Sequence, residues 1–135
     1  MKTALRAGLV AILATALAAP AGAATVKQVT NTCHAGAFTG ELTLRYETTA
    51  GYHHPLGAST VSGPYIGGSG TQLLRISYSD GGPTHMVYSR TSPVTDGEHQ
   101  ETLPAGPAIP VTARGTASAK FDSGTASCTA AVPIS

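Results

Sequence analysis

The chain has 135 residues, of which 41% are hydrophobic, 11% are charged and none is tryptophan. Eight basic residues nearly balance seven acidic ones and form no run. This argues against a nucleic-acid partner, because binding to phosphates depends on clustered Lys and Arg. For the same reason the chain has no polybasic patch that would hold it on an anionic membrane.

Residues 1–23 are predicted to be a secretory signal peptide. Lys2 and Arg6 give a positive start, an apolar run follows, and Ala21-Gly22-Ala23 supplies the small-residue pattern that a signal peptidase accepts. The apolar run is too short to span a bilayer comfortably, so a membrane anchor is not expected. We therefore expect a secreted, extracellular product in which residues 24–135 form one domain, with no membrane contact after cleavage.

The first part of this domain is predicted to form two strands. Thr25–Cys33 is a looser strand that ends in a turn containing Gly36. In Glu41–Thr48, two leucines and a tyrosine alternate strictly with polar residues, as expected of a half-buried strand. This is the clearest strand signal in the chain.

The segment Gly51–Gly70, which begins with the sequence GYHHPLG, is predicted to be a long loop. Tyr52 and Tyr65 fall in it, next to glycine and proline residues. Exposed tyrosines beside flexible backbone are suited to stack on sugar rings or to contact a protein partner. They are candidate binding residues, and His53 and His54 belong to the same candidate site.

A hairpin and a shorter strand follow. Thr71–Ser79 and Thr84–Thr91 alternate in polarity on either side of Asp80–Pro83, a strong turn signal because its glycines permit positive φ. Ser92–Gly97 is predicted to form the next turn, and Glu98–Leu103 a short strand after it.

The C-terminal third is predicted to form a last pair of strands, Ile109–Lys120 and Thr125–Val132, around a turn at Asp122–Gly124. Alternation places Cys128 on the apolar side of its strand. Because an even pair of cysteines in an exported protein is most simply a disulfide, we predict that Cys128 is bonded to Cys33.

These patterns favour an all-β fold. About seven short strands at intervals of roughly 8–12 residues predict an antiparallel β-sandwich, and an immunoglobulin-like arrangement is the leading expectation. The separation of Cys33 from Cys128 suggests that the disulfide joins the terminal strands rather than the centres of the two sheets. A small open β-barrel is the alternative fold.

Histidines are the residues that could indicate a metal site. No pair has the i, i+4 spacing of helical ligands, and a site would need His53 and His54 to chelate together in an irregular loop. We therefore predict no metal and no cofactor, and a small His-based metal-binding protein is kept as an alternative. The five histidines of the mature chain are His34, His53, His54, His85 and His99.

Catalytic motifs are incomplete. Gly67–Thr71 lacks the glycine that stands two residues after the serine in a nucleophile elbow. Asp96–His99 holds two carboxylates and an imidazole, but Asp-Gly is an ordinary turn pair and the next two side chains face opposite ways along a strand. No enzymatic activity is predicted.

The sequence thus predicts a secreted binding or structural module without catalysis. Its expected partner is a cell-envelope polymer, such as a polysaccharide, or another exported protein, and the module itself is expected to be a monomer. An inhibitor of an extracellular hydrolase, presenting the segment Gly51–Gly70 as a rigid insert, is an alternative function.

Overall fold

The computed structural model describes residues 24–135, and the predicted signal peptide lies outside the described residues. All regular structure in the described part is β-strand, because alternating apolar and polar residues recur between glycine-rich turns. No helix among these residues is long and apolar enough to cross a membrane. The strands are β1 (Thr25–Ala35), β2 (Phe38–Thr49), β3 (Tyr52–Gly63), β4 (Ser69–Ser79), β5 (His85–Thr95), β6 (Gly97–Thr102), β7 (Ile109–Pro110), β8 (Arg114–Asp122) and β9 (Ser127–Ile134).

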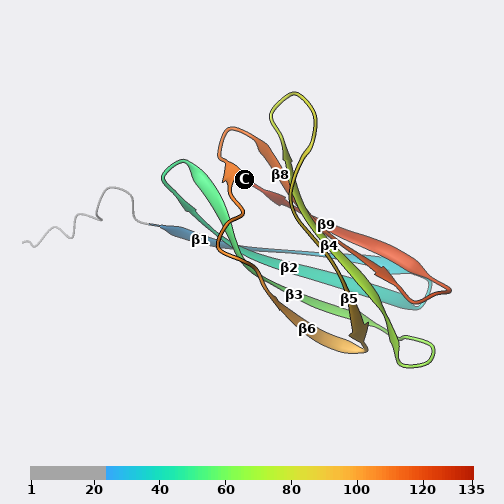
Figure 1. Ribbon diagram of the computed structural model, residues 1–135. Coiled ribbons are helices and arrows are strands. Elements are labelled where there is room, and N and C mark those ends of the chain that lie inside the picture. Colours follow the sequence, from blue (N-terminus) through green and yellow to red (C-terminus); the bar gives the residue numbers. More distant parts are fainter. Residues whose placement is uncertain (1–23) are drawn as a thin grey trace, which may run out of the picture.

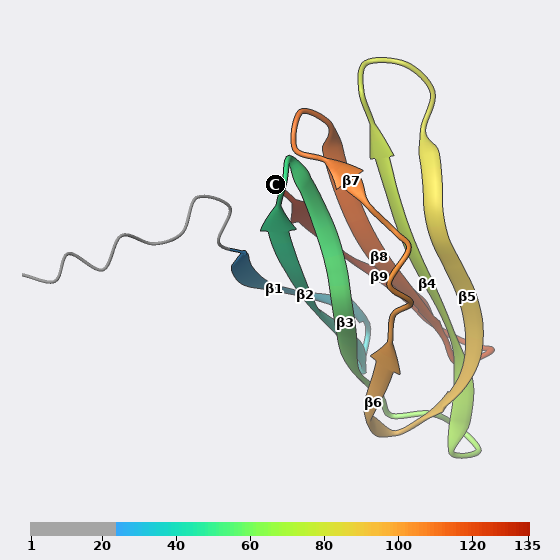
Figure 2. The same ribbon diagram turned by 60° about the vertical axis from the view of Figure 1, so that its left-hand side comes forward.

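The strands form two antiparallel sheets packed face to face (Figure 1). Sheet A has the order β1-β2-β3-β6, with the short β7 also paired to β3, and sheet B has the order β5-β4-β8-β9. The hairpin between β4 and β5 reaches beyond the rest of the sandwich (Figure 2). Strand pairing in the described residues stays within each sheet, so the predicted antiparallel sandwich is confirmed and the open barrel is not formed.

The connections follow an immunoglobulin-like pattern. The chain passes from β3 in sheet A to β4 in sheet B, yet β3 pairs with β6 and β4 pairs with β8. Immunoglobulin domains likewise pair strand B with E in one sheet and C with F in the other. Strand β1 is an addition outside this framework, on the free side of β2.

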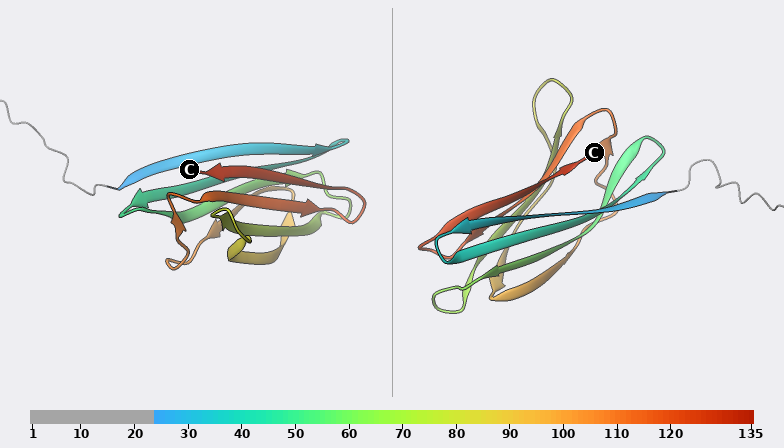
Figure 3. Two further views of the ribbon diagram at one scale, coloured as in Figure 1. Left: turned by 90° about the horizontal axis from the view of Figure 1, so that it is seen from above. Right: turned by 180° about the vertical axis from the view of Figure 1, so that it is seen from behind.

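The disulfide joins this added strand to the last one. Cys33 on β1 is bonded to Cys128 on β9, with the two Cα atoms 5.7 Å apart, as predicted. Seen from above, β1 and β9 lie side by side at one edge of the sandwich (Figure 3). Gly40 pairs with Cys33 and has no side chain, because a Cβ there would lie 2.3 Å from the ring of Phe121.

The core lies between the sheets and follows the predicted alternation. Leu42, Leu44 and Tyr46 of β2 point into this core, as do Leu74 and Ile76 of β4, and all five are essentially inaccessible to solvent. Small residues on β8 and β9 let the sheets approach closely. Further buried members are Phe38, Ala58, Tyr65, Val94, Leu103, Ile109, Ala113, Ala117, Ala119, Phe121, Ala130, Val132 and Ile134.

The prediction of a long loop over Gly51–Gly70 is wrong. Ala50 and Gly51 both have positive φ (52° and 83°) and make a two-residue hairpin, after which β3 begins at once. Pro55 is accommodated because the pairing shifts between Arg45 and Tyr46, at a bulge. The rigid insert expected of a hydrolase inhibitor is therefore not formed by this segment.

The predicted turn Ser92–Gly97 is also largely wrong, since β5 continues to Thr95 and the chain bends only at Asp96. Pro93 is tolerated because β5 is an edge strand, where a missing N–H does not interrupt the ladder.

Candidate binding groove on the outer face of sheet A

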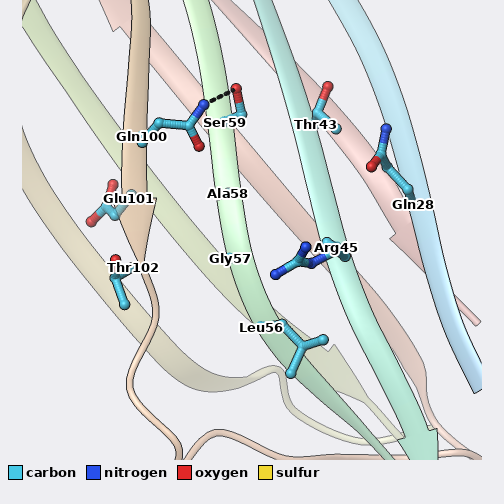
Figure 4. Close-up of a pocket in the computed structure, with 10 residues that line it drawn as sticks. All are labelled: Gln28, Thr43, Arg45, Leu56, Gly57, Ala58, Ser59, Gln100, Glu101 and Thr102. Carbon is cyan, nitrogen blue, oxygen red and sulfur yellow. Dashed lines mark hydrogen bonds between the residues drawn. The ribbon is translucent and has the colours of Figure 1, made fainter. Parts of the chain in front are cut away.

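The outer face of sheet A is hollowed by a groove of about 540 Å³ (Figure 4). It crosses four strands, β1, β2, β3 and β6, and its floor is β3. Amide, hydroxyl and guanidinium groups dominate its lining. These polar side chains are Gln28, Thr43, Arg45, Ser59, Gln100 and Thr102.

The register of the sheet explains the hollow. Gln28 pairs with Arg45, Arg45 with Gly57, and Gly57 with Thr102, so one row across the sheet has a glycine between larger residues. In the next row, Ser59 takes the central position. A strand with small side chains between strands with long ones leaves a trough over the central backbone.

Arg45 is the prominent free donor of the groove. Figure 4 shows its side chain reaching from β2 over β3, beside Gly57 and Leu56. Among residues 24–135 no carboxylate forms an ion pair with it, and it makes no side-chain hydrogen bond. Its guanidinium therefore keeps its donors for a ligand, and their planar arrangement suits bidentate binding.

Other groove side chains are already positioned by hydrogen bonds. Gln100 Nε2 donates to Ser59 Oγ at 3.2 Å, and it also donates to Glu98. On the other side of Arg45, the hydroxyls of Thr30 and Thr43 share a hydrogen bond of 2.8 Å. These bonds hold the side chains in defined rotamers, which lowers the entropy lost on binding.

The predicted site residues Tyr52 and His54 lie on this same outer face. Tyr52 begins β3 and is 46% exposed. The ring of His54, two residues on, is tilted against it with the ring centroids 6.3 Å apart. Both belong to a regular strand rather than to a loop, and neither lines the groove itself.

His53 points the other way and is buried. Its Nδ1 is 2.6 Å from Thr48 Oγ1, and its ring meets Tyr46 edge-on at 5.4 Å between centroids. Burial lowers the pKa of His53, and the charges of Lys27 and His54 add to this effect. The imidazole is thus a neutral structural group at the sheet interior.

The prediction that Tyr65 is exposed is wrong. Its side chain is 5% exposed, packs against Phe38 with the ring centroids 5.2 Å apart, and donates its hydroxyl to Ser62 Oγ at 2.6 Å. Burial raises the pKa of the Tyr65 hydroxyl. Gly70 creates the space for the ring, since a Cβ there would lie 2.4 Å from it. Tyr65 is a core residue and is not available to a ligand.

The histidines do not converge. His53 and His54 face opposite sides of sheet A, because neighbouring residues of a strand alternate. Within the part of the chain that the structure describes, no group of three or more His, Cys, Asp or Glu side chains is arranged to hold a metal ion. The irregular chelating loop that the metal hypothesis required is replaced by a strand.

Sequence reasoning missed a buried polar cluster between β5 and β6. Glu101 is 6% exposed and accepts hydrogen bonds from Tyr88 Oη at 2.7 Å and Gln72 Nε2 at 3.2 Å. Thr60 Oγ1 donates to Gln72 Oε1 at 2.5 Å, and Arg90 Nε lies 3.8 Å from the carboxylate. Burial first, and then Glu101, raise the pKa of Tyr88. The cluster holds the edge of the sandwich and turns the Glu101 carboxylate away from the groove.

The groove residues were missed for a different reason. Arg45 and Thr43 were predictable as outward residues of the clearest strand, but Gln100 joins the same groove only because β6 pairs with β3 in sheet A. The chain matches no family model, and no curated protein or solved structure is significantly similar to it. The geometry of this groove is therefore the basis for a functional proposal.

Proposed function

We propose that this protein is a secreted, non-catalytic binding module that holds a hydroxyl-rich polymer, a polysaccharide of the cell envelope, in the groove of sheet A. The observation that carries the proposal is a trough over Gly57, bordered by the free guanidinium of Arg45 and by the positioned amide of Gln100.

The lining favours a polysaccharide over an exported protein. Amides, hydroxyls and a guanidinium supply alternating donors and acceptors, which complement sugar hydroxyls. The central part of a protein interface is instead usually apolar and rich in aromatic residues. The volume of about 540 Å³ lies within the range of small-molecule sites, so a short stretch of a sugar chain fits.

The decisive variant fills the groove without disturbing the fold. Gly57 has no positive φ, and a Cβ there would meet only the Glu101 carbonyl oxygen at 3.7 Å, an ordinary contact. Gly57→Val places a residue that favours strands in the floor of the groove. We expect a melting temperature equal to or above that of the native protein, together with at least a tenfold loss of affinity.

Binding is measured first by co-sedimentation with insoluble cell-wall polysaccharide and then by calorimetry. Gly82→Val is the matched control, because Gly82 also has room for a Cβ but lies at the tip of the β4–β5 hairpin in sheet B. Native protein that stays in the supernatant, or a Gly57→Val variant that sediments as well as the native protein, would refute the proposal.

A second pair of variants tests the guanidinium. Arg45→Ala removes the free donor of the groove, and we expect roughly a 10- to 100-fold loss of affinity, the range for a hydrogen bond to a charged group. Arg75→Ala removes an exposed arginine from β4 in sheet B and should leave binding unchanged. Equal effects of the two substitutions would indicate nonspecific electrostatic binding.

A further inference from the structure

We infer that the ligand is a neutral glycan chain that runs along β3, from the groove to Tyr52, and that the ring of Tyr52 stacks on a sugar at one end. This inference rests on the proposed function and adds a second subsite and a charge preference to it.

The first observation is the line that β3 makes on the outer face. Tyr52, His54 and Leu56 are alternate residues of the strand, and the groove begins at Leu56. The four-residue step from Tyr52 to Leu56 spans about 13 Å, so a glycan chain that occupies the groove reaches Tyr52 by extending along β3.

The second observation is the exposure of this one ring. Tyr46 and Tyr65 are buried, and Tyr78 and Tyr88 are half-buried, whereas Tyr52 is the exposed one of the five tyrosines. Val111, another exposed apolar residue, follows Pro110, the residue paired with Tyr52, and its N–H donates to the carbonyl oxygen of Gly51 at 3.0 Å.

The neighbourhood of the ring provides a surface for a sugar. Tyr52 is 46% exposed and tilted against His54, so one side of the ring is supported while another is free. An amphipathic ring of this kind packs against the apolar face of a pyranose and leaves the sugar hydroxyls to water. The ring also has few rotatable bonds, so little conformational entropy is lost when it binds.

The third observation is the charge of the outer face. Arg45 is the one Arg or Lys that the four strands present on it, whereas Glu41, Glu47 and Glu98 present carboxylates there. Glu47 lies two residues from Arg45 on the same side of β2. A chain with a carboxylate on every sugar would meet more like charge than opposite charge, so the face favours a neutral chain.

The inference is tested by measuring how affinity depends on the length of the glycan. The probe is a hydrolysate of the cell-wall polysaccharide preparation, separated into neutral and acidic fractions and sized from di- to octasaccharides. We expect the affinity for neutral fragments to rise roughly 3- to 10-fold once they span both the groove and Tyr52. Tyr52→Ala should remove that rise and leave the affinity for the shortest bound fragments unchanged.

Two controls accompany this measurement. Tyr52→Phe keeps the ring and should keep the dependence on length. Ile66→Ala removes an exposed apolar side chain from the turn after β3, at the opposite end of that strand, and should have no effect.

The outcomes separate the two proposals. If short and long neutral fragments bind equally, or if Tyr52→Ala keeps the dependence on length, the Tyr52 subsite is refuted while the groove stands. If the acidic fraction binds more tightly, the charge preference is refuted. If no fragment binds and Gly57→Val behaves like the native protein, the proposed function itself fails.

Discussion

The two long edges of this sandwich are closed by different chemistry. At the edge formed by β1 and β9, the disulfide Cys33–Cys128 is joined by a hydrogen bond from Asn31 Nδ2 to the Ala131 carbonyl oxygen at 2.8 Å. At the edge formed by β5 and β6, the buried carboxylate of Glu101 accepts hydrogen bonds from two strands of sheet B, from Gln72 of β4 and from Tyr88 of β5. The first edge is held by a covalent bond and by a hydrogen bond to a backbone carbonyl group. The second edge is held by hydrogen bonds between side chains alone.

This difference implies different vulnerabilities. The covalent edge limits the unfolded chain and tolerates changes in neighbouring side chains. The polar edge stabilises only while every buried donor and acceptor keeps a partner, because an unsatisfied buried group costs more than a hydrogen bond gains. The two edges should therefore fail under different conditions.

The largest effect is expected from removing the disulfide. It closes a loop with a sequence separation of 95, for which the chain-entropy model gives about 4–5 kcal/mol of stabilisation. A double Cys33→Ala/Cys128→Ala variant should lose that amount in guanidinium unfolding, and hydrogen exchange should show β1 losing protection first. The reduced native chain is the control and should match the variant. A loss below about 1 kcal/mol would contradict the entropic account.

Breaking the polar edge is the next largest effect. Glu101→Ala leaves Gln72 Nε2 and the Tyr88 hydroxyl without their acceptor, and we expect a loss of about 2–3 kcal/mol in urea unfolding. Glu101→Gln should cost less, because an amide oxygen can still accept from Tyr88. Glu98→Ala, which removes an exposed carboxylate from the same strand, should be nearly neutral. Equal losses for Glu101→Ala and Glu98→Ala would show that the cluster does not hold this edge.

Local pattern was sufficient to predict most of the fold. Alternation in Glu41–Thr48 and Thr125–Val132 identified the inward faces of β2 and β9, and therefore the side of β9 that carries Cys128. It failed where turn residues stand inside a strand. Pro55 and Gly57 are typical of loops, yet both lie in β3, where the bulge between Arg45 and Tyr46 accommodates them.

The candidate site was predictable only in part. Tyr52 and Tyr65 have the same local signature, a tyrosine beside glycine or proline, yet Phe38 and Gly70 make a buried pocket for one of them alone. The groove needed the register of four strands, and the pairing of β3 with β6 is a crossover that no local pattern indicates. The sequence therefore predicts that Arg45 points outward from its strand, but it does not predict that Arg45 is part of a site.

The polar edge should weaken at high pH. The pKa of Tyr88 is raised above its ordinary value near 10, chiefly by burial and then by Glu101, so the native state holds this proton more tightly than the unfolded chain. Its contribution is complete below pH 10 and is lost as the pH rises further. The free energy of unfolding, measured in urea between pH 9 and pH 11, should therefore fall less steeply with pH in Tyr88→Phe than in the native protein. Tyr65→Phe tests the other tyrosine whose pKa burial raises.

If Tyr88→Phe keeps the full alkaline loss while Tyr65→Phe removes it, the sensitivity belongs to the core beneath β3 rather than to the polar edge. In that case the loss of stability at high pH would not come from the Glu101 cluster, and it could not be used to distinguish the polar edge from the covalent edge.

The smallest effect should appear at low pH, at His53 in the interior of sheet A. His53 lies near Lys27 of β1, and burial, with help from this lysine, lowers its pKa below the ordinary value of 6.5. The native state therefore binds fewer protons here than the unfolded chain, so the contribution is complete above pH 6.5 and is lost as the pH falls below it. His53→Gln should reduce the loss of stability between pH 7.5 and pH 5, whereas His54→Gln should retain it. If both variants follow the native pH profile, the acid response does not come from His53.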